Sequence, residues 1–327
     1  MRLSHKILLI LIIFNFSIYS KAKAVPESFA DLAEKLMPSV VNISTTQTVR
    51  TTSNQFPFQF PPGSPFEDFF NEFFERRGAP PRERRQQPQQ AMGSGFIIDS
   101  SGLIVTNNHV IDKAVSINVI LTDNRSFKAK LIGKDQKTDL ALIKIDVDED
   151  LPTVTWGDSD KAKVGNWVLA IGNPFGLVNT VTAGIISARA RDISVGPFDD
   201  FIQTDASINR GNSGGPLFNI NGEVIGINTA IVSQTGGSIG LGFAIPSNSA
   251  KKIVQQLKEF GKTKRGWLGV QIQPVTKDFA ESLGLPEQKG AFVSNVNPMG
   301  PSKDAGLEPG DVILKFNDVE IIKMSDL

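Results

Sequence analysis

The sequence predicts a mainly β protein, in which a large all-β domain is followed by one helix and a second, smaller domain. Across residues 91–233, short apolar runs alternate with turns rich in Gly, Asn and Asp, a pattern typical of a sandwich or barrel. Clear helical periodicity occurs only at residues 247–260, where Ser247 can cap the helix and Gly261 ends it. We expect this helix to close the first domain, and residues 262–265 to form a short polar linker.

The N-terminus has the pattern of an export signal. Arg2 and Lys6 precede an apolar run over residues 7–19, and Ala22–Ala24 is a small-x-small cleavage pattern. An uncleaved membrane anchor is the alternative, but so short an apolar run does not cross a bilayer comfortably. We therefore expect residues 1–24 to be a cleaved signal peptide, and membrane association to be at most peripheral.

Charge and composition argue against several classes of function. The chain holds 34 Lys and Arg against 34 Asp and Glu, and loss of residues 1–24 discards four basic residues and no acidic one. A mildly acidic mature chain has no surplus positive charge for a polyanion, so no nucleic-acid partner is expected. With no cysteine, and with His109 as the one histidine left after His5 is removed, neither disulfides nor an ordinary zinc site is expected. We find no dinucleotide or phosphate-binding motif, and expect no metal and no cofactor.

Residues 48–90 form an inserted loop rich in Pro, Gln, Arg and Phe, where frequent prolines exclude long regular structure. Five phenylalanines within it fall at helical spacing with acidic residues between them, which indicates a short amphipathic helix. They are Phe66, Phe69, Phe70, Phe73 and Phe74. Two interpretations stay open: the helix packs on its own domain, or its apolar face docks on a neighbouring subunit or a client protein.

Two polar residues near strand ends are candidates for acid–base chemistry. His109 follows the apolar run 103–106, at a position where scaffolds present catalytic side chains. A lone histidine there is more often structural, but any histidine-dependent chemistry of the mature chain must use His109. Asp139 heads the largely apolar run 140–145. It is either a surface turn residue or a buried carboxylate that needs a partner such as an imidazole N–H.

The glycine-rich segment 209–217 favours nucleophilic catalysis by Ser213. A serine hydroxyl attacks well only when a base takes its proton and donors hold the developing oxyanion. Gly211, Gly214 and Gly215 allow a tight backbone in which the N–H groups of Gly211 and Ser213 converge as an oxyanion hole. A glycine-rich hairpin without activity is the alternative. The serine is favoured because base, acid and nucleophile all occur at strand or loop positions.

Several motifs together resemble the HtrA/Deg family of Do-type bacterial periplasmic serine proteases, close to its DegP/DegQ branch. They are residues 93–96 (GSGF), 106–110 (TNNHV), 139–144 (DLALIK), 170–176 (AIGNPFG) and 203–206 (QTDA) running into 209–217. The resemblance implies a chymotrypsin-like double β-barrel with the active site between the barrels. It places His109 as general base and Asp139 as orienting carboxylate on the first barrel, and Ser213 as nucleophile on the second. It also implies the periplasm and a homotrimer or larger homo-oligomer.

The same resemblance assigns further roles. The segment Asn228, Thr229, Ala230 and Ile231 is similar to the strand and loop along which substrate lies in extended form. Ile208 and Ile231 resemble the lining of the primary specificity pocket, and two isoleucines favour small aliphatic side chains before the cleaved bond. Arg191 matches a sensor-loop arginine that relays activation to the catalytic loop.

The C-terminal segment resembles a PDZ domain of the bacterial, circularly permuted type. Arg265, Gly266, Trp267 and Leu268 match its peptide carboxylate loop. The groove helix of such a domain would begin at about Ser325, so the sequence to Leu327 corresponds to a partial domain, and a fragment or an early stop is expected. We expect under-covered apolar residues there, loose folding, and weak or no binding of hydrophobic C-terminal peptides.

These observations predict three parts: a signal peptide at 1–24, a trypsin-like serine protease domain at 25–262 that contains the 48–90 insertion, and a partial PDZ domain at 263–327. The expected function is ATP-independent serine endoproteolysis of unfolded or damaged envelope proteins. The alternative is a holdase or peptide-binding protein that uses the Phe-rich insertion and the PDZ groove, with hydrolysis minor or lost.

Overall fold

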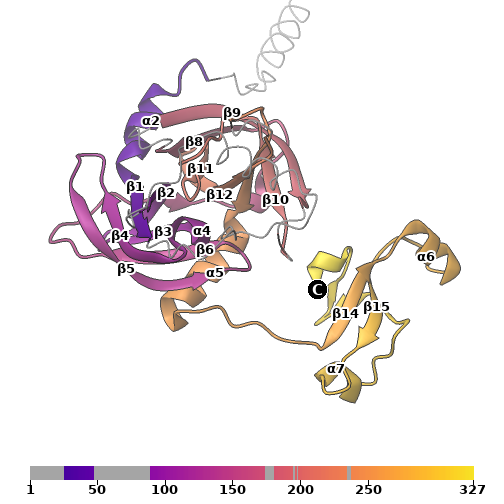
Figure 1. Cartoon of the computed structure of the whole chain (residues 1–327). Coiled ribbons are helices and arrows are strands. Elements are labelled where there is room, and N and C mark those ends of the chain that lie inside the picture. Colours follow the sequence, from indigo (N-terminus) through magenta and orange to yellow (C-terminus); the bar gives the residue numbers. More distant parts are fainter. Residues whose placement is uncertain (1–25, 48–88, 174–179, 194–195, 197, 234–236) are drawn as a thin grey trace, which may run out of the picture. The chain divides into compact units, whose positions relative to one another are not determined.

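The computed structural model describes residues 26–47, 89–173, 180–193, 196, 198–233 and 237–327 (Figure 1). The predicted signal peptide lies outside these residues. So do residues 48–88 of the predicted insertion, with its five phenylalanines. The described chain includes a short helix, α2 (Ala30–Leu36), and a 3-10 turn at Met37–Ser39.

Six antiparallel strands close a first barrel in the order β1-β2-β3-β6-β5-β4 (Figure 1). The strands are β1 (Val40–Gln47), β2 (Gln89–Asp99), β3 (Leu103–Asn107), β4 (Ala114–Ile120), β5 (Ser126–Asp135) and β6 (Leu140–Ile145). Inward side chains such as Ile43, Ile104 and Ile143 are fully buried in one core cluster. The β3–β6 register pairs Asn107 with Leu140, so residues just after β3 lie beside the residue just before β6.

A second barrel forms from β8 to β13, in the order β11-β8-β9-β10-β13-β12, and the pairing of β11 with β12 closes it. Its strands are β8 (Trp167–Gly172), β9 (Thr180–Arg191), β10 (Phe201–Thr204), β11 (Pro216–Asn219), β12 (Glu223–Ile231) and β13 (Gly242–Pro246). A short strand, β7 (Thr155–Trp156), adds to β12 in parallel. The mainly β double barrel expected from the sequence is therefore confirmed.

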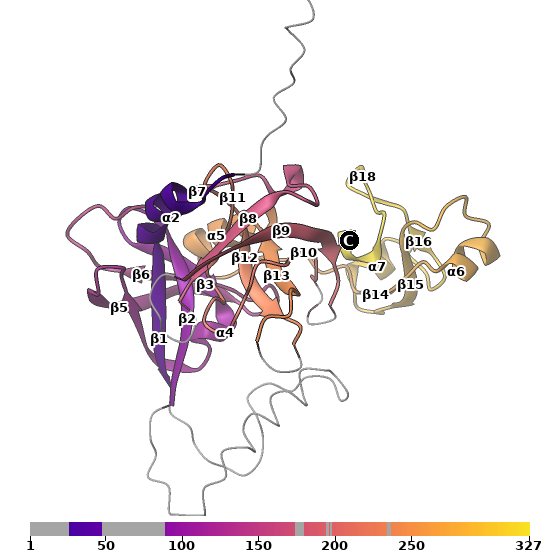
Figure 2. The same ribbon diagram turned by 90° about the horizontal axis from the view of Figure 1, so that it is seen from above.

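Three kinds of contact join the barrels. The Val154 N–H donates to the Ile97 carbonyl at 3.0 Å. The Phe96 and Trp156 rings meet edge to face, with centroids 5.5 Å apart. The long helix α5 (Ser247–Phe260) packs against β5 and β6 of the first barrel and against β12 and β13 of the second (Figure 2).

Helix α5 spans the predicted residues, but its N-terminus is built differently from the prediction. Gly261 ends it in a left-handed conformation, with φ +68°, as expected. The N-cap is Pro246, and Ser247 makes no capping bond. The buried Ser247 hydroxyl donates instead to the Gly157 carbonyl at 3.0 Å. The prediction that Ser247 caps the helix was therefore wrong. A buried hydroxyl must have a hydrogen-bond partner, and packing brings the Gly157 carbonyl to Ser247.

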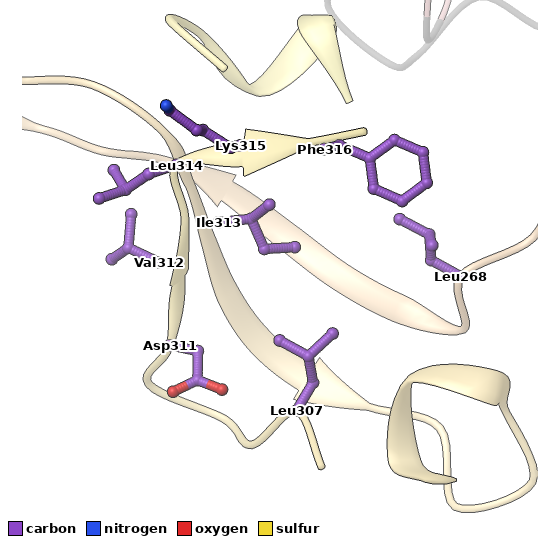
Figure 3. Close-up of a pocket in the computed structure, with 8 residues that line it drawn as sticks. All are labelled: Leu268, Leu307, Asp311, Val312, Ile313, Leu314, Lys315 and Phe316. Carbon is purple, nitrogen blue, oxygen red and sulfur yellow. The ribbon is translucent and has the colours of Figure 1, made fainter. Parts of the chain in front are cut away.

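The C-terminal segment has two small sheets that share no strand with the barrels. Strands β14 (Val270–Pro274), β15 (Ala291–Val296) and β16 (Val312–Ile313) form one sheet, β17 (Lys315–Phe316) pairs with β18 (Val319–Glu320), and short helices lie at α6 (Lys277–Ser282), α7 (Pro301–Asp304) and the 3-10 turn Met324–Asp326. Ala291 and Val293 are fully buried in it, whereas Leu314 is 47% exposed and Phe316 45%. Leu268, Leu314 and Phe316 are among the residues that line an open pocket of about 410 Å³ (Figure 3). Large apolar side chains of this segment are thus partly exposed to solvent, as the sequence predicted.

Candidate active site

The first barrel brings His109 and Asp139 into direct contact. His109 lies in the single-turn helix α4 (Asn108–Ile111), which directly follows β3. Because β3 and β6 pair, Asp139 in the turn before β6 lies beside His109. One carboxylate oxygen of Asp139 lies 2.6 Å from His109 Nδ1, and the other accepts the His109 backbone N–H at 2.8 Å. Asp139 therefore fixes both the ring and the backbone of His109.

Backbone contacts hold Asp139 itself in an uncommon conformation. Its φ is +54°, in the left-handed region that residues other than glycine seldom adopt. The Asp139 carbonyl accepts the Asn108 N–H at 3.0 Å and the Asn107 side-chain amide at 2.8 Å. Strain of this kind persists only where the surroundings over-determine the conformation, and such residues gather at functional sites.

The environment raises the pKa of His109 above 6.5. Burial by itself would lower this pKa, but the charge of Asp139 and its hydrogen bond to the ring outweigh the burial. The carboxylate requires a hydrogen on Nδ1, which leaves the Nε2 lone pair available in the neutral ring. With 31% of its side chain exposed, His109 can meet a reactant from solvent.

Ser213 lies in a tight loop of the second barrel between β10 and β11. Gly211 and Gly214 adopt φ values of +99° and +84°, which only glycine takes up readily. The Gly214 N–H donates to the Asn228 carbonyl at 2.8 Å and the Gly215 N–H to the Asn212 carbonyl at 3.0 Å. Within the described residues, the backbone N–H groups of Gly211 and Ser213 have no acceptor in the chain. Both donors are available for an anionic oxygen.

The serine loop abuts the strand end that carries His109. A Cβ placed on Gly214 would lie 3.0 Å from the Asn107 backbone nitrogen. The Ser213 hydroxyl donates to the Thr229 carbonyl at 3.4 Å and, within the described part of the chain, makes no hydrogen bond with His109. The Asn107 amide donates to the Thr229 hydroxyl at 3.1 Å. Asn107 therefore links Asp139 on the first barrel to Thr229 on the second, the residue whose carbonyl accepts the Ser213 hydroxyl. Sequence reasoning missed this link.

The predicted substrate-binding residues lie on and beside β12. Asn228 is fully buried and donates to the Pro216 carbonyl at 3.1 Å, so its side chain supports the fold. A bulge between Asn228 and Ala230 leaves Thr229 out of the ladder with β13. Ile208 is 1% exposed, and the partly buried Ile231 packs against the core cluster that contains it. Of the two isoleucines predicted to share a pocket, one thus belongs to this cluster and the other packs against it.

Arg191 lies apart from these residues, at the end of β9. Its Nε donates to the Gln203 side-chain oxygen at 2.9 Å on β10. The arrangement ties the ends of two strands together and involves none of the residues around Ser213 that are described above. A sensor role for Arg191 stays a prediction.

The predicted carboxylate loop has its arginine engaged elsewhere. The Arg265 guanidinium pairs with Asp135, donating to Oδ1 at 2.8 Å. Burial would raise the pKa of Asp135, but hydrogen bonds from Arg265, Thr138 and Thr263 outweigh it and lower that pKa to about 2. Trp267 is 62% exposed, and Gly266 is exposed too. The Leu268 carbonyl accepts from Ser302. Because the Arg265 guanidinium is paired with Asp135, a peptide carboxylate at this loop would have to meet its backbone N–H groups.

Two features bear on cofactors and membranes. Among the described residues, no group of three or more His, Asp or Glu side chains could hold a metal ion. In the same part of the chain, no helix has the length and apolar character needed to span a bilayer.

Comparison with protein families and curated proteins adds independent information. A trypsin-like peptidase domain model matches residues 93–227, and a PDZ domain model matches residues 256–327. A "Probable periplasmic serine endoprotease DegP-like" from Brucella suis biovar 1 (strain 1330) is 49% identical over 320 residues, which are 91% of this chain and 62% of that protein. A protein of the same description from Marinomonas sp. (strain MWYL1) is 51% identical over 317 residues, 95% of this chain and 66% of the relative. The chain spans less than two thirds of the length of these relatives.

Comparison with solved structures also finds serine proteases. An HtrA-type protease, AlgW with tripeptide, matches with a TM-score of 0.73 and 41% identity, and the match covers 90% of this chain and 84% of that one. A serine endoprotease from Yersinia pestis matches with a TM-score of 0.61 and 34% identity, over 91% of this chain and 85% of that one. At these identities the likeness extends beyond the fold to the residues themselves.

Proposed function

Because this chain belongs to the HtrA family of trypsin-like serine proteases, we propose that it is an ATP-independent serine endoprotease of unfolded or damaged envelope proteins. The observation that carries the proposal is the 2.6 Å contact between His109 Nδ1 and Asp139, together with a glycine loop in which the N–H groups of Gly211 and Ser213 have no acceptor among the described residues. Base, orienting acid, nucleophile and oxyanion donors are the four parts that acyl transfer needs.

The proposed reaction begins when the Ser213 hydroxyl turns from the Thr229 carbonyl toward His109. His109 Nε2 takes the hydroxyl proton as the serine oxygen attacks the scissile carbonyl. Asp139 holds the Nδ1 hydrogen throughout and stabilises the imidazolium that forms. The N–H groups of Gly211 and Ser213 donate to the developing oxyanion.

Collapse of that tetrahedral intermediate breaks the peptide bond. His109 passes its proton to the departing amine, and an ester of Ser213 with the acyl half of the substrate remains. A water molecule then attacks the ester by the same route, with His109 again as base, and releases the carboxylic acid and Ser213.

The substrate would lie as an added strand along Asn228–Ile231, where the bulge at Thr229 frees backbone from the β13 ladder. Ile208 and Ile231 would line the pocket for the residue before the cleaved bond. An apolar, branched lining leaves no partner for a charged side chain and little room for a large one. We infer small aliphatic residues such as Val, Ala or Ile at that position.

The cellular setting rests on relatives. The curated proteins that match are described as periplasmic, which supports export to the periplasm by a cleaved signal peptide at 1–24. In that compartment we propose unfolded proteins as the substrates.

Further proposals concern the organisation of the chain. We propose a protease domain at 25–262, a PDZ domain at 263–327, and assembly into a homotrimer or larger homo-oligomer. We also propose a sensor role for Arg191 and capture of peptide carboxylates by Arg265–Leu268.

The test compares the protein with its Ser213→Ala variant on unfolded casein. Loss of the nucleophile should lower kcat by at least about 10³-fold. Unchanged unfolding by urea would show that the fold is intact. Casein cleavage by the variant at the parent rate would refute the proposal. A parent protein that does not cleave, but delays aggregation of unfolded casein as well as Ser213→Ala does, would instead support the holdase function, which the comparisons do not favour.

A further inference from the structure

Ser94, in the GSGF motif of residues 93–96, has no role in the reaction proposed above. It lies on β2 of the first barrel, opposite Asn42 on β1, and no part of it is exposed to solvent. A fully buried serine with a hydroxyl and two backbone polar groups needs partners for all three. The identity of those partners indicates what the residue does.

Both hydrogen-bond donors of Ser94 reach across to the serine loop of the second barrel, residues 209–215. The Ser94 hydroxyl donates to the Gly211 carbonyl at 2.6 Å. The Ser94 backbone N–H donates to the Ser213 carbonyl at 2.8 Å. One residue of the first barrel thus holds the carbonyls on either side of Asn212.

Two more hydrogen bonds fix Ser94 itself. Its hydroxyl oxygen accepts the Asn173 N–H at 2.8 Å, at the end of β8. Its carbonyl accepts the Thr106 hydroxyl at 2.7 Å, from the strand that leads to His109. The Ser94 hydroxyl is therefore oriented as a donor to Gly211, because its own acceptor side is already used by Asn173.

The two held carbonyls belong to the peptide groups on either side of an oxyanion donor. Peptide groups are planar, so holding the Gly211 and Ser213 carbonyls also fixes the N–H groups of Asn212 and Gly214. The Ser213 N–H belongs to the peptide between Asn212 and Ser213, which lies between the two carbonyls that Ser94 holds. Gly211, with φ +99°, is the flexible point of the loop, and its carbonyl is one of the two.

Close packing makes the site selective for a small residue. A Cβ on Gly215 would lie 3.2 Å from Ser94 Cβ, and one on Gly172 would lie 3.0 Å from the Ser94 hydroxyl oxygen. A Cβ on Gly214 would lie 2.2 Å from the Ser94 carbonyl oxygen. Three glycines from two segments, the end of β8 and the serine loop, therefore permit the approach of Ser94 to the loop, and a side chain with more atoms than serine has no space there.

We propose that Ser94 is a positioning residue, which holds the serine loop so that the N–H groups of Gly211 and Ser213 converge on the oxyanion. The inference rests on the proposed protease function and adds a residue to its machinery. Ser94 touches neither substrate nor the reacting atoms. Its contribution should be made in the transition state, where the oxyanion exists, and should be small for substrate binding.

The first measurement is steady-state cleavage of a chromogenic peptide with Val before the scissile bond by the full chain and by Ser94→Ala. We expect kcat to fall by about 10–100-fold with KM within about threefold, less than the 10²–10³-fold that loss of an oxyanion donor itself costs. The second is the affinity of a peptidyl boronic acid ending in valine, whose serine adduct places an anionic oxygen in the oxyanion hole. It should weaken by the same factor.

Ser247→Ala is the matched control. Ser247 is also fully buried, and its hydroxyl also donates to a backbone carbonyl, that of Gly157. Both variants lose stability through the same type of bond, but only Ser94→Ala should lose kcat and boronate affinity. Equal losses in the two variants, or parent values in Ser94→Ala, would overturn the proposal.

Ser94→Cys keeps a weak donor at the same place and should retain more kcat than Ser94→Ala. If Ser94→Ala does not fold, the Cys variant decides alone. Because a thiol donates far more weakly than a hydroxyl, the inference then requires a joint loss of kcat and boronate affinity with parent KM, and parent values of both would overturn it. Failure of the protease function itself would differ, because the parent chain would then neither cleave the peptide nor bind the boronate.

Discussion

The two barrels hold their parts of the candidate site by different means. In the first barrel, a charged side chain fixes His109: Asp139 contacts both the ring and the backbone of the histidine. In the second, backbone groups fix Ser213 through glycines at positive φ and carbonyls held from outside the loop. The pair on the first barrel is complete within that barrel. The serine loop depends on the other barrel, through Ser94 and Asn107, so its geometry should be the more easily disturbed half.

The largest expected effect tests the charge in the first barrel. Asp139→Asn should lower kcat by about 10⁴-fold, because an amide neither stabilises the imidazolium nor enforces the required tautomer. Steady-state kinetics on the peptide substrate would measure it. Asp146→Asn is the control, since Asp146 pairs with Lys130 on the same barrel and is 72% exposed. A loss below about tenfold for Asp139→Asn would show that charge is not what matters there.

The next effect tests the close approach in the second barrel. Gly214→Ala forces a Cβ to 2.2 Å from the Ser94 carbonyl oxygen at φ +84°, whereas Gly165 has φ +88° and nothing within 4 Å. We expect Gly165→Ala to cost about 1 kcal/mol of unfolding free energy and Gly214→Ala at least about 3 kcal/mol with loss of activity. Urea denaturation would measure both. Equal costs would mean that backbone strain alone, without the approach of the barrels, governs the loop.

The pH profile sharpens the comparison further. The base must be neutral, so kcat/KM should fall as pH drops through the raised pKa of His109, and the acidic limb should lie above 6.5. In Asp139→Asn only burial remains, which lowers this pKa, so the residual activity should persist to lower pH. The His109 NMR resonance should titrate together with the limb in each protein. A limb that does not move would identify another group as the base.

The smallest expected effect concerns the pocket of the second barrel. Product maps from mass spectrometry should show cleavage mainly after Val, Ala or Ile. Ile208→Val removes one methylene from the lining and should raise cleavage after Leu relative to Val by about tenfold or less. Tm should fall slightly, because Ile208 is 1% exposed. A parent map dominated by Lys, Arg or Phe would show that Ile208 and Ile231 do not form this pocket.

Some of this arrangement could be predicted from the sequence because the signals are local. Alternating apolar runs predicted the mainly β fold, and the helix at residues 247–260 followed from its spacing and from Gly261. His109 was a candidate because it is the one histidine outside the predicted signal peptide, and Ser213 because glycines surround it. Residue type and short-range spacing determine these features, whatever the rest of the chain does.

Other features depend on which strands pair and how closely the barrels approach. The β3–β6 register, and not the local sequence, sets Asp139 against His109. The hydroxyl of Ser247 looked like a cap, yet it bonds to Gly157, some ninety residues earlier in the chain. Ser94 looked like one more strand serine, yet its hydroxyl reaches Gly211 on the other barrel. A buried polar group takes the partner that the packed chain brings to it, and sequence spacing carries no measure of that proximity.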